Sequence, residues 1–227
     1  MDRRLIERTI EVAVATGAFG ARPRLPALDS SPLWGASRVE DTYNLLGHAL
    51  RKALDVIARR ASAGAGGDSC RSRSWTAERV EFESGLGRGT SDDPGEQARA
   101  LSIVLGVLNA VEGWLDTHPA GSDAPVVGES LATAKLVKQQ DVEITEAGTP
   151  GLRDGVAKDR RISVEDAQMR HGRKSRSIRV DGYKRHVLHD LDTGLVRAVG
   201  LTAANAPEAS VTEPMRADLA CQRVVLP

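Results

Sequence analysis

Apolar side chains recur at helical spacing along much of the chain, and each such stretch predicts an amphipathic helix. The predicted helices cover residues 4–15, 38–60, 94–115, 129–140 and 207–220. Ser37 and Glu40 form a capping-box pattern at the start of the second helix, where their side chains can each accept a backbone N–H. Asp93 followed by Pro94 predicts the start of the third helix.

Strand patterns are fewer and lie near the start of the chain and in its last third. The predicted strands are residues 25–29, 161–164, 179–189 and 195–202. Pro26 weakens the first of them, because proline lacks the N–H that a central strand uses. The last two form a β-hairpin that turns at Gly194. Helices, then a hairpin, then a final helix predict a mixed α/β fold with a helical insertion.

Two segments show no periodicity. Residues 61–94 are rich in Gly, Ser and Arg, which predicts a disordered connection between two helices. Residues 145–160 are expected to form a polar loop.

The composition excludes several classes of protein. The 227 residues are 41% hydrophobic, which is enough for one domain with an insertion. The longest apolar stretch, residues 101–115, is broken by Asn109 and Glu112, so no membrane-spanning helix is expected. A secretory signal is not recognised and Cys70 and Cys221 are too few for a disulfide framework, so we expect a cytoplasmic protein. Aromatic residues make up 3%, too few for a protein that stacks single-stranded bases.

The formal net charge is zero, but the charge is distributed unevenly. Residues 153–186 hold eleven Lys or Arg and five Asp or Glu, a net charge of +6, so the rest of the chain carries −6. Such a stretch suits a nucleic-acid partner, because each contact with a phosphate releases condensed counterions. A solvated basic surface would have the same composition.

Several common catalytic motifs are missing from the sequence. Cys70, Cys221 and the five histidines lack the spacing of zinc ligands. The glycines at 85, 87 and 89 are not followed by Lys-Ser or Lys-Thr, so they do not form a phosphate-binding loop. The G-x-S-x-G pattern of serine hydrolases does not occur.

Two segments carry a more specific pattern. The first is L-D-S-S-P-L-W-G at residues 28–35, which runs into R-V-E-D-T-Y-N-L-L at 38–46. The second contains M-R-H-G-R-K-S at 169–175, D-G-Y-K-R-H at 181–186, D-L-D-T-G-L at 190–195 and T-A-A-N-A-P-E at 202–208. In this order and spacing, the patterns resemble bacterial insertion-sequence transposases of the DDE type. The resemblance covers residues 1–60 and 95–227.

The resemblance implies a partial ribonuclease-H-like fold with a long helical insertion after the first strand. Residues 1–37 would supply the N-terminal helix and first strand of the catalytic domain. Residues 38–150 would form the helical insertion, including the disordered connection. Residues 151–227 would supply the β-hairpin and a helix.

The family's chemistry uses two Mg²⁺ ions, held by two Asp and one Glu, to cleave and transfer DNA strands. Asp29 matches the first carboxylate, which makes it the expected catalytic residue and metal ligand by the resemblance; without the resemblance, its local context favours an aspartate that closes a turn. The second Asp would follow a strand that should start at the end of this sequence, and the family's N-terminal DNA-binding region has no counterpart. We therefore expect a chain that is truncated at both ends and inactive by itself. The Gly-, Ser- and Arg-rich composition of residues 61–94 would also fit a segment that is read out of frame.

DNA contacts are expected from the basic segment, where arginine can grip phosphates through planar, bidentate hydrogen bonds. The expected contacts are Arg170, Arg173, Lys174, Arg176, Lys184 and His186. Lys184 and His186 would share one face of their strand; a solvated strand edge is the alternative. The expected partners are the transposon ends and target DNA, together with a second copy of the chain or a full-length transposase. Besides a transposase, the sequence leaves open a non-catalytic DNA-binding or regulatory fragment, or an inactive remnant.

Overall fold

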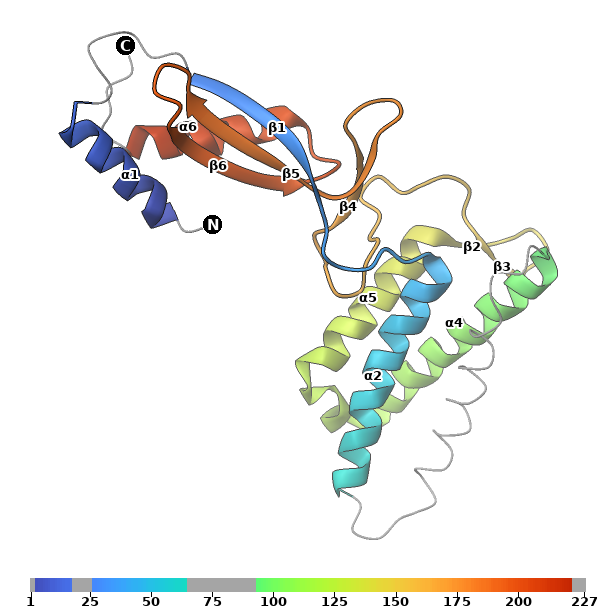
Figure 1. The fold of residues 1–227 in the computed structure, drawn as a ribbon. Coiled ribbons are helices and arrows are strands. Elements are labelled where there is room, and N and C mark those ends of the chain that lie inside the picture. The colour runs from blue at the N-terminus through green and yellow to red at the C-terminus, as the bar shows by residue number, and fades with distance from the viewer. Residues whose placement is uncertain (1–2, 18–25, 65–92, 222–227) are drawn as a thin grey trace. The chain divides into compact units, whose positions relative to one another are not determined.

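The computed structural model describes residues 3–17, 26–64 and 93–221, which belong to two compact units (Figure 1). The sheet unit consists of residues 1–36 and 168–227, and the helical unit of residues 37–167. The mixed α/β class is confirmed, and every strand pairing is antiparallel. The predicted disordered connection lies outside the described residues, except for 61–64, which are helical, and 93–94, where the next helix begins.

The sheet unit is organised around one long central strand. Its elements are α1 (Arg3–Ala15), β1 (Pro26–Trp34), β4 (Arg170–Arg173), β5 (Arg179–Asp190), β6 (Val196–Ala203), a 3-10 helix (Glu208–Val211) and α6 (Thr212–Cys221). β5 pairs with β1 from Gly182 to Asp190 and with β6 from Tyr183 to His189. Its first residues, Arg179–Gly182, pair with β4. The predicted hairpin is therefore confirmed as β5 and β6, and Gly194 has the positive φ of 68° that its turn requires.

β1 is longer than the sequence predicted. The expected strand was residues 25–29, but the pairing with β5 continues to Trp34 and includes Pro32. β5 is the one pairing partner of β1 among the described residues, so β1 is an edge strand there. Proline is tolerated in an edge strand, because a missing N–H on the open side breaks no ladder hydrogen bond.

One face of the sheet is covered by α6. Side chains alternate between the two faces of a strand, and the buried positions of β5 are all even-numbered: Val180, Gly182, His186, Leu188 and Asp190. Leu188 and Ala198 pack against the apolar side of the final helical segment at Val211, Met215 and Leu219. Gly200 allows this approach, since a Cβ there would lie 2.4 Å from Val211.

In its described residues, 37–64 and 93–167, the helical unit contains three α-helices and a small hairpin. They are α2 (Thr42–Gly64), α4 (Pro94–Thr117), α5 (Pro125–Asp141), β2 (Val142–Ile144) and β3 (Pro150–Leu152), with a 3-10 turn at Pro119–Asp123. Their apolar stripes meet in one core, which includes Leu46, Leu50, Leu108 and Val137. α4 starts at the predicted Asp93, whose carboxylate accepts the backbone N–H of Glu96.

The predicted capping box is wrong. α2 starts at Thr42 rather than beside Ser37, and the Asp41 carboxylate accepts the backbone N–H of Asn44. Glu40 is instead buried, and its carboxylate contacts the His48 ring.

The helical unit ends at Ala167, whereas the sequence analysis placed the end of the helical insertion at residue 150. Arg160 forms a hydrogen-bonded ion pair with Asp141 at 2.8 Å, and Val164 belongs to the helical core. Residues 161–164, predicted as a strand, are not paired in a sheet. The carbonyl of Ile162 accepts one hydrogen bond, from the backbone N–H of Glu40. Residues 151–167 thus pack with the helices, because their buried side chains find partners there.

α4 has the length and apolar composition of a membrane-spanning helix, which the sequence analysis did not expect of residues 101–115. Five of its apolar residues are buried in the helical unit. A core helix of a water-soluble protein passes the same test.

Candidate nucleic-acid interface

Asp29 lies on the exposed side of β1. It is the fourth residue of that nine-residue strand, so it does not end the strand, as the predicted strand 25–29 would have placed it. Its register partner on β5 is Val187, and its side chain is exposed. Within the described part of the chain, its carboxylate has no hydrogen bond or ion pair, so it is not the turn-closing aspartate of the alternative interpretation.

The face of the sheet that carries Asp29 is opposite to the face that carries His186. Ser30 pairs with His186 and Pro32 with Lys184, so these even-numbered residues point together toward the α6 side. By the same alternation, the odd-numbered residues of β5, including Arg185, share the face of Asp29. The predicted DNA contacts of β5 and the predicted catalytic residue are therefore on different faces.

His186 is a buried part of the sheet. Its side chain is fully buried, Nδ1 is 2.8 Å from the Ser30 hydroxyl and Nε2 is 2.9 Å from the Thr202 hydroxyl. Burial lowers the pKa of His186, Glu208 opposes this shift and Lys184 adds to it. The ring thus links three neighbouring strands and presents no surface to a DNA phosphate.

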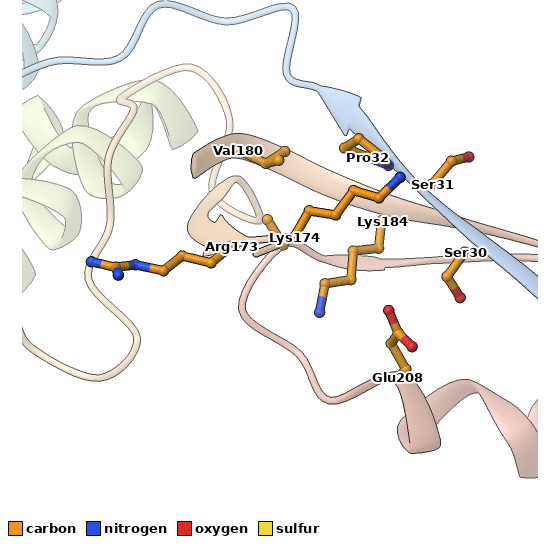
Figure 2. A pocket seen from close by; sticks show the side chains of 9 residues that line it. Ser30, Ser31, Pro32, Arg173, Lys174, Val180, Lys184 and Glu208 are labelled. Carbon is orange, nitrogen blue, oxygen red and sulfur yellow. The ribbon is translucent and has the colours of Figure 1, made fainter. Parts of the chain in front are cut away.

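Lys184 lies beside a small pocket on the same face (Figure 2). Its Nζ donates a 2.8 Å hydrogen bond to the carbonyl of Ala206. Figure 2 shows Lys184 and Glu208 extending toward the same space. The pocket has a volume of about 20 Å³, which is room for one water molecule and far too small for a nucleotide. We therefore regard it as a gap under the sheet and not as a ligand site.

The remaining predicted DNA contacts lie on the β4–β5 hairpin. Arg173, Lys174 and Arg176 are exposed. Arg170 is half-buried and donates a hydrogen bond to the carbonyl of Met169. In Figure 2, the side chain of Arg173 extends away from the other labelled side chains. The structure therefore brings three of the six predicted contacts together on one exposed loop and strand.

Two further basic residues were missed by the sequence analysis of DNA contacts. Arg179 is exposed and is the direct cross-strand partner of Arg173. Arg185 is exposed on the face of Asp29 and donates from Nε and Nη2 to the Ser31 hydroxyl, at 3.2 and 3.1 Å. The alternation of side chains along the predicted strand 179–189 was the available signal, because it places Arg179 and Arg185 on the same face of that strand.

The carboxylates described here do not make a magnesium site. Mg²⁺ in such chemistry needs several oxygen ligands held together. In residues 3–17, 26–64 and 93–221, no group of three His, Cys, Asp or Glu side chains is placed to hold a metal. Asp29 alone supplies one ligand, fewer than such a metal site requires.

Asp190 forms the turn between β5 and β6. Its Oδ1 accepts from the backbone N–H groups of Asp192 and Thr193, while the side chain is almost fully buried. Burial disfavours the charged form, but these bonds, the Thr193 hydroxyl and the charge of Arg197 together hold the pKa of Asp190 below its ordinary value. The D-L-D-T-G-L pattern is therefore explained by turn geometry.

Comparison of the chain with protein-family models, with curated proteins and with solved structures found no match. The assignment of a function therefore depends on the residues and geometry described above.

Proposed function

We propose that this chain carries part of the catalytic domain of a DDE-type transposase, which cleaves and transfers DNA strands in the cytoplasm. The observation that carries the proposal is the element order of the sheet unit. An exposed Asp29 on β1 is followed, after an insertion, by the hairpin β5–β6 and by α6. This is the order in which the DDE resemblance expects the first catalytic strand, the returning hairpin and the next helix.

Three further features support the proposal. Among the described strands, β1 has one open edge, which leaves room for another strand, as a partial ribonuclease-H-like fold requires. The hairpin between β4 and β5 carries exposed cations for a DNA backbone. Asp29 has no competing partner in the described chain, so its carboxylate is free to bind a metal once other carboxylates are supplied.

In this proposal, the 227 residues alone do not cleave DNA, because one carboxylate cannot hold two Mg²⁺ ions in a fixed geometry. The chain's own residues hold the DNA and present Asp29. A second candidate function is DNA binding without catalysis. It is favoured because the described residues contain no cluster of carboxylates that could hold a metal ion. In both cases the protein partners would be a second copy or a full-length transposase.

The test joins the chain to the segment encoded after the codon for Pro227, in whichever frame supplies the further carboxylates. The joined polypeptide should cleave duplex DNA in the presence of Mg²⁺. Asp29→Asn should abolish cleavage, whereas Asp192→Asn, which changes an exposed carboxylate in a turn, should leave it unchanged. Cleavage that survives Asp29→Asn, or cleavage by the 227 residues alone, would contradict the proposal.

A further inference from the structure

On the N-terminal side of Gly182, at the start of β5, the described sheet narrows to two strands. The register of β1 with β5 ends at the pair Trp34–Gly182, and the register of β6 with β5 ends at Ala203–Tyr183. From Gly182 to Arg179, β5 pairs with β4, and residues 174–178 close the hairpin. We call residues 170–182 the ribbon; its tip is the orange loop that joins β4 to β5 in Figure 1.

Two glycines attach the base of the ribbon firmly to the sheet. A Cβ on Gly172 would lie 2.1 Å from the carbonyl oxygen of Ala204. A Cβ on Gly182 would lie 2.3 Å from the backbone nitrogen of Gly35, and its φ of 147° is one that L-residues rarely adopt. The backbone at the base is therefore close-packed on both sides, which fixes the direction of the ribbon.

The ribbon carries an unbalanced positive charge. Arg173 and Arg179 are directly opposite each other in the register, and both are exposed. Like charges at directly opposite positions destabilise a hairpin. Lys174 and Arg176 add two more cations at the tip, and none of these four has an acidic partner in the described part of the chain. Asp181, the one acidic residue of the ribbon, is already bonded to His171 at 2.6 Å.

An anionic partner would relieve this repulsion, and the shape of the ribbon indicates which one. The major groove of B-form DNA is about 12 Å wide and 8.5 Å deep and admits a two-stranded β-ribbon. The paired part from Arg179 to Gly182 spans about 10 Å at the usual rise per residue, so the tip reaches the floor of that groove. The tip is closed by a 3.0 Å bond from the Lys174 N–H to the Ile178 carbonyl, and it exposes Ser175 and Ser177.

We infer that the ribbon inserts into the major groove of duplex DNA, with Arg173 and Arg179 on the phosphates and the tip against the base edges. This inference rests on the proposed DNA-binding function and names the form of DNA and the groove. Arg179 and Arg185 lie on the sheet face that carries Asp29. A duplex held by the ribbon thus meets the face on which Asp29 is exposed.

The first experiment measures duplex affinity of the full chain against salt. Arg173→Ala/Arg179→Ala should weaken binding at least tenfold and reduce the salt slope by about 1.8, since each phosphate contact contributes about 0.9. The control is Arg59→Ala/Arg60→Ala, which removes the same charge from the exposed end of α2 and should have little effect. Equal losses in both variants would overturn the inference, because binding would then follow net charge.

The second experiment uses the unaltered chain and therefore does not depend on the folding of a variant. Duplex DNA whose cytosines carry glucosylated hydroxymethyl groups has a filled major groove, and it should bind at least tenfold more weakly than plain duplex. Distamycin, which fills the minor groove, should not compete, and A-form duplex RNA should bind poorly because its major groove is too narrow. Equal binding to glucosylated DNA would refute the ribbon inference and leave DNA binding intact; no binding to any duplex would refute both.

Discussion

Replacing His186 by alanine should lower the stability of the sheet unit without a direct effect on DNA contacts. The ring is fully buried and its two nitrogens bond to Ser30 and Thr202. Each neutral hydrogen bond contributes about 1 kcal/mol, and the cavity left by the ring adds about 1–2 kcal/mol. We expect His186→Ala to lower the free energy of unfolding by about 3 kcal/mol.

The pH dependence gives this prediction a second signature. Burial lowers the pKa of His186 in the folded chain, so the unfolded chain takes up the proton first as the pH falls. Stability from the neutral ring is therefore complete above the unfolded pKa of about 6.5 and is lost as the pH falls below it toward the folded pKa. His186→Ala should remove this part of the acid sensitivity.

Urea unfolding, followed by far-ultraviolet circular dichroism and by tryptophan fluorescence above and below that pH, measures both effects; replacing Trp75 and Trp114 by phenylalanine leaves Trp34 as the reporter of the sheet unit. At about 2 kcal/mol per molar urea, the midpoint should fall by roughly 1.5 M. An unchanged midpoint with a tenfold loss of DNA affinity would refute this reasoning, because His186 would then act as a DNA contact and not as a link between strands.

Substitutions at Gly182, Asp190 and Arg160, with Gly194→Asn and a double variant for comparison, test the local geometry. Gly182→Ala should cost about 3 kcal/mol in urea unfolding, because its φ and the nearby Gly35 backbone leave no room for a Cβ, whereas Gly194→Asn should cost under 1 kcal/mol at a position with open space. Asp190→Asn should lower the free energy of unfolding at neutral pH by about 2 kcal/mol. The pKa of Asp190 is lowered in the folded chain, so the stability that its charge contributes is present above about pH 4 and is lost as the pH falls through the folded pKa. Melts of the variant after a pH jump should lack this pH dependence. Arg160→Met should destabilise the helical unit by about 3 kcal/mol by leaving the buried Asp141 unpaired, and Arg160→Met/Asp141→Leu should recover part of the loss in thermal melts.

Helices and the main hairpin could be predicted because local signals decide them. Asp93 caps α4 as its sequence context indicates, and the spacing of apolar residues locates α1, α5 and α6 within a few residues. The prediction of a strand at residues 161–164 was wrong because an alternation of polar and apolar residues over four positions fits an extended loop as well as it fits a strand. Tertiary partners, here Asp141 for Arg160 and the helical core for Val164, decided where that segment lies.

The candidate site was less predictable than the fold. Sequence grouped His186 with the exposed arginines because it occurs among them, and only the register with Ser30 and Thr202 explains its burial. Gly172 and Gly182 stood in the basic patterns without an assigned role, and the close approach of Ala204 and Gly35 supplies one. The pairing of Arg173 with Arg179 depends on the hairpin register, which the sequence did not define.

The central claim is tested most directly by the nucleotide sequence that follows the codon for Pro227, read in all three frames. The transposase proposal predicts a segment with a strand pattern that ends in Asp, followed further on by a helical segment that contains a Glu. Together with Asp29, these would complete the three carboxylates. A downstream sequence with no such segment in any frame would contradict the catalytic assignment of Asp29.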